Sequence, residues 1–383
     1  MRTYKTEIEL NNTASEIFFR TVGVCRFIYN LFIETNKQLY LANKDTNSLT
    51  YMNNYEFSRW LNNEYMKNNP DKQWIKEVSS KAIRNAIDNA NTAFMKFFKQ
   101  KYGFPKFKVK RKNDCSFYFV KTDANTKIKH ERHRIKIPTL GWCKLKEFGY
   151  IPASSIITSG TISYKAGRFY LTVNTKDDRV IRNRAKNDGI GIDLGVKDFA
   201  ILSDGTKYST IKYNKLTTTL KREQRKLSRK YKINKNKENL HRNIEKQIIK
   251  LQKINHKIAN IRNDYQNKVI SDIINREPRF ITIENLNVSG MMKNRHLSKA
   301  IANQGFYAFV QKLQYKCGLN GIELRQVDRF YPSSRICSEC GSIKKDLTLK
   351  DRVYICPKCG VVIDRDINAA INLKNCQQYK KLA

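Results

Sequence analysis

Residues 190–195 read Ile-Gly-Ile-Asp-Leu-Gly, and this stretch decides how the second half of the chain is expected to fold. Side chains alternate across a strand, so the two isoleucines and Leu194 point one way while Gly191 and Asp193 point the other. An ionised aspartate inside an apolar strand is costly unless it is paired or bound to a metal. A glycine there permits close approach of another backbone or a ligand. With the turn and apolar run that follow (196–202), the stretch predicts a buried β-hairpin that carries a candidate site residue, Asp193.

Two further segments place carboxylates where a site could form. The apolar run 280–283 predicts a buried strand that ends at Glu284, and the run 364–370 places aspartates at the start of a helix predicted over 366–373. Mg²⁺ prefers carboxylate oxygens, and phosphodiester hydrolysis by two metal ions needs several of them to converge. Each residue alone is more often a helix cap, a turn residue or an ion-pair partner. Asp198 and Asp204 lie in turn-like sequence and are interpreted as structural.

Four cysteines have the spacing of a zinc site. They form two Cys-x₂-Cys pairs separated by fifteen residues, each followed by a glycine: Cys337, Cys340 and Gly341, then Cys356, Cys359 and Gly360. This spacing is typical of four-cysteine Zn²⁺ sites. Because all four positions are filled, the site is expected to be structural rather than catalytic. The other five cysteines are scattered and are interpreted as buried small side chains or inert surface thiols.

The charge of the chain indicates a polyanionic partner. The 383 residues include 74 Lys and Arg against 34 Asp and Glu, a net charge of +40. Nucleic acid is the natural partner, because each neutralised phosphate releases condensed counterions. The alternatives are a basic ribosomal-type protein or a membrane-surface protein. The sequence shows no targeting signal and no apolar run of the ~18 residues that span a bilayer, so a cytoplasmic setting is expected.

Periodicity divides the chain into domains. Helical spacing over 14–40 and 81–99 predicts a helical domain at 14–98. Period-two alternation predicts an antiparallel β-barrel from residues 1–13 and 99–180, with strands that include 107–110, 116–120, 127–129 and 134–138. A charged linker follows at 176–186. The fold class expected is therefore an α/β core combined with a β-barrel and a helical domain, and the core contains a long basic helical hairpin at about 216–274.

Taken together, these motifs resemble the TnpB family of transposon-encoded, RNA-guided DNA nucleases, which are related to miniature type V CRISPR effectors. The resemblance rests on runs spread over nearly the whole chain: Gly191-Ile-Asp-Leu-Gly195, Ile283-Glu-Asn-Leu286, Pro332-Ser-Ser-Arg-Ile-Cys337, Cys356-Pro-x-Cys-Gly360 and Asp364-Arg-Asp-Ile-Asn-Ala-Ala370. Shorter matches at 26–30, 103–108 and 137–142 look like the family's helical domain and barrel.

The resemblance implies a RuvC-like nuclease with an RNase H fold at 187–332 and 363–383. The basic hairpin would interrupt this domain, and residues 333–362 would form an inserted zinc ribbon. Asp193, Glu284 and Asp366 match the catalytic, Mg²⁺-binding positions, and Asp364 is the alternative third ligand. Two Mg²⁺ ions and one structural Zn²⁺ are the cofactors expected.

The resemblance also implies the partners. A guide RNA from the transposon end would direct cleavage of double-stranded DNA beside a short adjacent motif, which the barrel and helical domain would read. A monomer is favoured, and no membrane partner is expected. Two other functions stay open at this point: an RNA-guided DNA-binding repressor that does not cut, and a transposase that acts directly on DNA ends.

Overall fold

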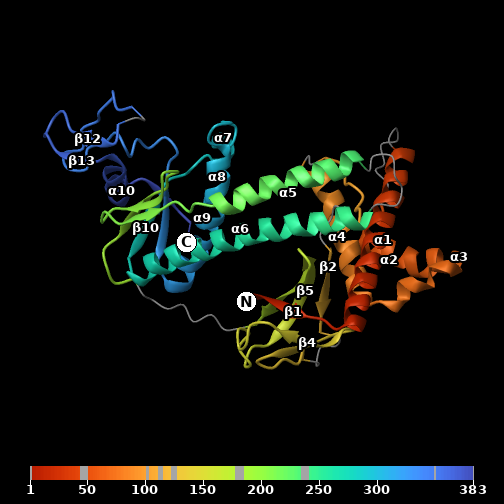
Figure 1. Ribbon diagram of the computed structural model, residues 1–383. Helices are drawn as coiled ribbons and strands as arrows, with labels where there is room; N and C mark the ends of the chain where they lie inside the picture. Colours follow the sequence, from red (N-terminus) through yellow and green to blue (C-terminus); the bar gives the residue numbers. More distant parts are fainter. Residues whose placement is uncertain are drawn as a thin grey trace. The chain divides into compact units, whose positions relative to one another are not determined.

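The computed structural model of the protein describes residues 2–43, 51–100, 103–110, 115–121, 127–176, 185–233, 241–348 and 351–382. The chain divides into two compact units, Met1–Asp178 and Arg179–Ala383, each with its own sheet (Figure 1). Most of the linker predicted at 176–186 lies outside the described residues.

Unit 1 is built on a six-stranded antiparallel sheet of order β2-β5-β6-β1-β4-β3. Its strands are β1 (Arg2–Glu9), β2 (Cys115–Val120), β3 (Arg134–Ile137), β4 (Gly141–Leu145), β5 (Ile157–Lys165) and β6 (Arg168–Thr175). As expected, the N-terminal strand completes the sheet, since β1 pairs with both β6 and β4. The predicted barrel is not closed: among the described strands β2 and β3 lie at opposite edges, so the sheet is an open half-barrel.

Two of the strands predicted for unit 1 do not form. At 107–110 the backbone of Lys108 is bonded to a side chain instead of a strand: its N–H donates to Asn30 Oδ1 (2.7 Å) and its carbonyl accepts from Asn30 Nδ2 (3.0 Å). At 127–129 the chain makes a single bridge, His130 to Ile135, before it turns into β3. Alternating sequence was present in both segments, but neither makes the run of bridges that defines a strand.

A helical layer lies between β1 and β2 in the sequence. Its main helices are α1 (Asn12–Ala42) and α4 (Ser80–Gln100), with the shorter α2 (Asn54–Trp60), α3 (Met66–Asn68) and the helical turns Leu61–Tyr65 and Pro70–Glu77 between them. Asn11 caps α1 by accepting from the Ala14 N–H at 2.8 Å. The layer has its own aromatic core around Phe32, Phe57 and Phe94, which are fully buried.

Unit 2 is built on a mixed sheet of order β14-β11-β10-β7-β8-β9. Its strands are β7 (Ile190–Asp193), β8 (Asp198–Leu202), β9 (Lys207–Ser209), β10 (Phe280–Ile283), β11 (Glu323–Val327) and β14 (Tyr379–Lys381). The predicted hairpin is present as β7 and β8, and β10 runs parallel to both β7 and β11. The short edge strands β9 and β14 had no signal in the sequence.

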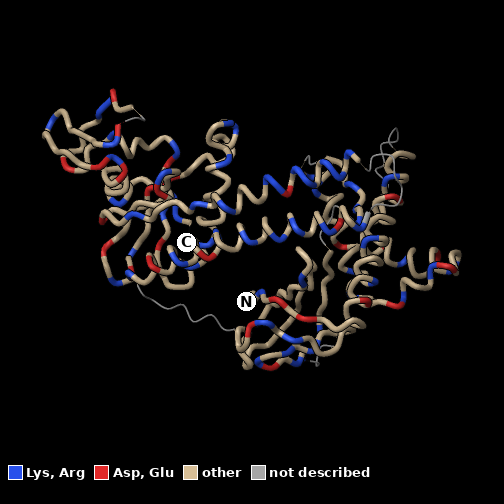
Figure 2. The backbone as a smooth tube through the Cα atoms, in the orientation of Figure 1, with Lys and Arg blue, Asp and Glu red and all other residues tan. Residues whose placement is uncertain are grey.

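Helices surround this sheet. The basic stretch forms a hairpin of α5 (Asn214–Ile233) and α6 (His241–Asn275), and Figure 2 shows Lys and Arg along both helices. The end of α6 packs into the core of unit 2, together with α8 (Ser298–Gln304) and α9 (Phe306–Asn320). The remaining elements are α7 (Val288–Met291), the paired strands β12 (Val353–Ile355) and β13 (Val362–Asp364), and α10 (Arg365–Asn375).

One charged side chain lies inside the helical hairpin. Glu223 on α5 is buried against α6, where Gln247 Nε2 donates to its carboxylate at 2.9 Å and Lys226 and Lys250 pair with it at 3.3 Å. These partners satisfy the buried charge, so a polar contact joins α5 to α6 inside the hairpin. None of the helices described is long and apolar enough to cross a membrane.

Candidate functional site

The first two carboxylates lie at the same edge of the unit 2 sheet. Asp193 is the last residue of β7, and Glu284 follows the last residue of β10. The two strands are parallel neighbours, with Ile192 opposite Ile283, so the next residue of each strand lies at an equivalent height. Carboxyl ends of parallel strands are where ligand sites of mixed sheets collect. Register alone therefore places Asp193 beside Glu284.

The third carboxylate reaches this edge on a helix. Asp366 is in the first turn of α10, which packs against β7. Gly191 makes this packing possible: a Cβ at its position would overlap the Ala370 carbonyl and lie 2.6 Å from the Lys374 nitrogen. The close backbone approach expected at Gly191 is thus an approach of α10, which brings Asp366 toward the strand that carries Asp193.

The three carboxylates lie close enough to affect one another electrostatically. Burial raises the pKa of Asp193 well above its usual value, and the charges of Glu284 and Asp366 raise it further, while Arg365 opposes them. Burial also raises the pKa of Glu284, although a hydrogen bond from Ser333 acts in the other direction. A group of carboxylates that are costly to ionise together is typical of a site for cations.

Asp364 and Asp366 occupy different environments. The Asp364 carboxylate caps α10 by accepting from the backbone N–H groups of Asp366 and Ile367 (2.9 and 3.2 Å), and it pairs with Lys207 at 2.6 Å. Although burial raises its pKa, these donors outweigh burial and lower it. Asp366 pairs with its neighbour Arg365 at 3.0 Å, and its carboxylate contributes to the field at Asp193 more strongly than that of Asp364.

The four cysteines come together as the spacing predicts. The sulfur atoms of Cys337 and Cys359, and those of Cys340 and Cys356, are 3.6 Å apart. Within the described part of the chain, these four side chains form the one group of three or more metal-binding residues whose ligand atoms all lie within 4.8 Å of one another. The carboxylates of the sheet edge are therefore spread more widely than the sulfurs.

The turns around the cysteines have the conformation of zinc knuckles. Gly341 and Gly360 have φ of 72° and 73°, a left-handed conformation that glycine adopts without strain. The N–H groups of Cys359 and Lys358 donate to Cys356 Sγ at 3.4 Å. The bond from the Cys359 N–H, followed by one from Ser342, lowers the pKa of Cys356 to about 5, which favours the thiolate that binds metal.

Comparison with known proteins gives three family matches along the chain. Residues 1–45 match "Helix-turn-helix domain" of the OrfB_IS605 type, residues 171–295 match "Probable transposase" (OrfB_IS605), and residues 306–373 match "Cas12f1-like, TNB domain". Together these matches cover more than half of the chain.

Relatives match over nearly the full length. The chain is 29% identical over 370 residues to "Putative RNA-guided DNA endonuclease InsQ" of Escherichia coli (strain K12), which covers 92% of this chain and 87% of that protein. It is 28% identical over 360 residues to "Putative RNA-guided DNA endonuclease" of Streptomyces pristinaespiralis, with 92% and 84% covered.

The chain belongs to the TnpB/IS605 OrfB family. Its fold is similar to a chain in the "Cryo-EM structure of the Cas12f1-sgRNA-target DNA complex", with a TM-score of 0.60, 15% identity, and 95% and 83% of the two chains covered. The resemblance stated from the motifs is thereby confirmed.

In this TnpB-family chain, three further residues tie the zinc segment to the carboxylates. Ser333 Oγ donates to Glu284 Oε1 at 2.6 Å. On α10, Asn372 Nδ2 donates to the Ser333 carbonyl (2.8 Å), and both Asn372 and Asn368 donate to the Ile336 carbonyl at 2.7 Å. The segment 333–336, just before the first cysteine, is thus hydrogen-bonded to α10, the helix that follows the last cysteine.

Ser333, Asn368 and Asn372 were not predicted from the sequence as residues of the site. One signal was present: the two asparagines are four residues apart, so they share a face of a helix on which apolar side chains would be expected. Both are buried, with 0% and 4% of their surface exposed. Buried side-chain amides need hydrogen-bond partners. A pair of them on one helix face therefore predicts that another segment of backbone packs there and accepts their hydrogen bonds.

Proposed function

We propose that this chain is an RNA-guided, Mg²⁺-dependent DNA endonuclease of a mobile element, with a RuvC-like catalytic core. The observation that carries the proposal is the meeting of Asp193, Glu284 and Asp366 at one sheet edge, close enough for the other two charges to raise the pKa of Asp193. RNA guidance and DNA as the substrate are carried over from the printed names of the full-length relatives.

The donor set fits magnesium. Asp193, Glu284 and Asp366 would hold the metal, since Mg²⁺ prefers carboxylate oxygens and keeps several waters. Their arrangement on two strands and a helix, wider than the cysteine cluster, suits two ions ~3.5–4 Å apart better than one enclosed ion. Bound Mg²⁺ supplies an activated water and stabilises charge on the attacking and leaving oxygens of a phosphodiester. Asp366 is favoured over Asp364 because the latter is committed to the helix cap and to Lys207.

The surrounding residues have positioning roles. The Ser333 hydroxyl would fix the orientation of the Glu284 carboxylate through its 2.6 Å bond. Arg365 would orient the Asp366 carboxylate in the absence of a cation. The four cysteines would hold Zn²⁺ as a closed structural site, since no ligand position is left for a substrate. In this proposal the zinc segment folds the chain that presents Ser333 and Asp366.

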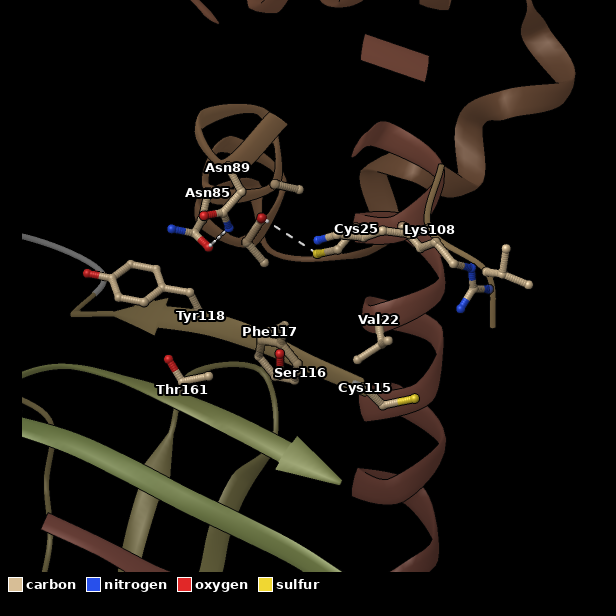
Figure 3. Close-up of a pocket in the computed structure, with 14 residues that line it drawn as sticks. Val22, Cys25, Asn85, Asn89, Lys108, Cys115, Ser116, Phe117, Tyr118 and Thr161 are labelled. Atoms are coloured by element: carbon tan, nitrogen blue, oxygen red, sulfur yellow. Dashed lines mark hydrogen bonds between the residues drawn. The ribbon is translucent and has the colours of Figure 1, made fainter. Parts of the chain in front are cut away.

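The half-barrel and the helical layer would read the target-adjacent DNA motif. Where they meet, a cavity of about 350 Å³ is lined by α1, α4 and β2. Figure 3 shows Asn85 and Asn89 of α4 on one side of this cavity and Lys108 on another. Asparagine pairs with the adenine edge and arginine with guanine, so the amides and Arg26, which also lines the cavity, have the chemistry of base readers. Substituting Asn89→Ala would then change the preferred motif without abolishing cleavage.

The test uses protein purified with its co-expressed RNA and a DNA target matched to that RNA. Asp193→Asn is expected to lower the cleavage rate by roughly a thousandfold, or about 4 kcal/mol of transition-state stabilisation, while guided binding persists. Asp198→Asn, which removes a neighbouring carboxylate at the start of β8, is the matched control. Equal cleavage by Asp193→Asn and wild type in Mg²⁺ would refute the proposal.

The same experiment separates the other functions. Stable guided binding by the wild type without cleavage of any matched target would identify a repressor. Strand-transfer products made without RNA would identify a transposase that acts directly on DNA ends. Sequencing the co-purified RNA tests the guide, because a guided enzyme carries one defined species.

A further inference from the structure

A second hollow of unit 1 is rimmed by lysines and lies away from the cavity of Figure 3. It has a volume of about 370 Å³ and is lined by residues 121, 127–129, 136–139 and 141. Four lysines contribute to it, namely Lys121, Lys127, Lys129 and Lys136, and none of the described residues that line it is acidic. The Lys136 N–H donates to the Lys129 carbonyl at 2.8 Å, which fixes two of these lysines on facing segments.

Three of the four lysines have no ion pair within the described residues. Lys127, Lys129 and Lys136 make no ion pair with any residue in the described ranges, whereas Lys144 on the adjacent strand pairs with Glu9 at 3.7 Å. Ammonium groups gathered without counterions repel one another, so their arrangement favours a ligand that brings negative charge.

The hollow has an apolar floor, and one residue at its edge has a strained backbone conformation. Ile128 and Ile137 are buried, with Pro138 beside them. The next residue, Thr139, has a φ of 72°, a conformation that costs a β-branched residue energy and that is found mainly at functional sites. The turn therefore holds an unfavourable backbone at the edge of a cationic, apolar-floored hollow.

We propose that this hollow binds one unpaired nucleotide of the RNA that the protein carries. The base lies against the isoleucines and Pro138, and the flanking phosphates lie on the ammonium groups. A volume of about 370 Å³ falls within the range of ~300–1,000 Å³ found for small-ligand sites. The inference rests on the proposed function, since it takes RNA as the partner.

RNA is favoured over target DNA as the source of the nucleotide. Loops and bulges of folded RNA present unstacked bases at no further cost, and proteins read RNA mainly at such bases. A base of duplex DNA would first have to be flipped out, which costs a few kcal/mol. A pocket that takes one base with its phosphates therefore suits an RNA loop.

The experiment uses the full-length protein with its co-expressed RNA containing 4-thiouridine. Ultraviolet cross-linking and peptide mapping are expected to join one RNA position to residues 127–141. In Lys129→Ala/Lys136→Ala the yield falls, and the slope of log affinity for that RNA against log salt is shallower by about 1.4, the value for two phosphate contacts on a single strand. Lys144→Ala/Lys165→Ala removes the same charge from β4 and β5 of the same sheet and keeps the cross-link.

The outcomes separate this inference from the proposed function. A defined RNA that binds and guides cleavage, with cross-links elsewhere or equally reduced in both double variants, overturns the nucleotide site and leaves the nuclease proposal standing. A cross-link from these residues to a thiothymidine-labelled target strand instead of RNA also overturns it. The absence of any defined RNA overturns both.

Discussion

Gly191 shows how a single residue without a side chain positions the site. It is the one residue of β7 at which the backbone of α10 approaches closely enough that a Cβ would collide with it. The helix then carries Asp366 toward Asp193, two residues farther along the same strand. Gly191, which has no side chain, therefore allows the helix packing that brings the carboxylates of Asp193 and Asp366 together.

Gly191→Ala is therefore expected to separate α10 from β7. Because the collision is with backbone atoms, the structure has to move, at a cost of about 1–3 kcal/mol of unfolding free energy. Cleavage should fall by more than this loss of stability explains, since Asp366 moves with the helix. Gly318→Ala on α9, where an added Cβ meets nothing within 4 Å, is the control and should be neutral or stabilising in the same denaturant melts.

The raised pKa of Asp193 predicts how stability depends on pH without magnesium. An acid whose pKa is higher in the folded protein contributes stability below its unfolded pKa of about 3.9, and that contribution is lost as pH rises through the folded value. Asp193→Asn should therefore stabilise the magnesium-free protein more at pH 7.5 than at pH 5.5, a range in which the cysteine thiolates can keep Zn²⁺. Added Mg²⁺ should raise the melting temperature of wild type more than that of the variant; equal responses would contradict a metal role for Asp193.

At the residue scale, the sequence predicted features encoded within a few neighbouring residues, and it missed contacts between residues that are far apart along the chain. The cysteine spacing and the carboxylates are visible within a few residues, so the cysteine cluster and the positions of Asp193 and Glu284 at strand ends were predicted. The bond from Ser333 to Glu284 joins residues 49 apart, and no local pattern encodes it. Of these contacts, only those of the two buried asparagines of α10 had a signal in the sequence, because both polar residues lie on one face of the predicted helix.

The four-cysteine segment and α10 are held together by hydrogen bonds and by a shared residue. Strand β13 ends at Asp364, which is also the cap of α10, and the asparagines of α10 hold the chain just before Cys337. The ribbon core beside the cysteines is small, with Leu347 and Tyr354 as its buried members. A core of that size contributes little folding free energy, so we expect the segment to depend on the Zn²⁺ proposed for its cysteines.

Removing zinc should therefore disorder the ribbon and release the start of α10. Hydrogen exchange is expected to lose protection over 333–370 after treatment with a zinc-selective chelator in the presence of Mg²⁺, while β7 and β8 stay protected. Cleavage should be lost in parallel and return with Zn²⁺. Full cleavage by zinc-free protein would separate the ribbon from the site.

The helical hairpin is expected to loosen in acid because of Glu223. A hydrogen bond from Gln247 and the nearby lysines lower the pKa of Glu223 to about 2, so its contribution is present above the unfolded value of about 4.3 and is lost as pH falls toward 2. Protection factors in α5, which compare each exchange rate with that of an unstructured amide at the same pH, should fall from pH 5 to pH 3 in wild type. In Glu223→Gln they should depend less on pH, whereas Asp264→Asn, which removes an exposed ion pair on α6, should behave as wild type.

At the scale of elements, periodicity predicted the long helices and most strands of both sheets. Edge strands were missed because β9 and β14 have three residues each, too few to show a period. Residues 107–110 were wrongly predicted as a strand because alternation does not reveal that Asn30 takes the backbone bonds. The prediction of a closed barrel was also wrong. Closure depends on whether the edge strands β2 and β3 pair with each other, which alternation within each strand does not show.

At the scale of the molecule, each unit has the core it needs to fold. Unit 1 has one core between its sheet and α1 and a second within the helical layer, while the largest core of unit 2 surrounds its own sheet. The sequence indicated the boundary between the two units only through the charged linker predicted at 176–186.

Residues 1–178 produced alone are therefore expected to unfold in one cooperative transition and to retain RNA binding that weakens steeply with salt. Residues 179–383 alone should bind one zinc per chain. Aggregation of both pieces under conditions that keep the full chain soluble would contradict two independent cores.

The wide separation of the three carboxylates along the chain has a consequence for biosynthesis. A ribosome finishes unit 1 at residue 178, but it must add almost 190 more residues before Asp366 exists. At roughly 5–20 residues per second, that delay is roughly 10–40 seconds. A nascent chain can thus fold the unit proposed to hold RNA while it still lacks the last acidic residue, so each new molecule can be loaded before it is able to cut.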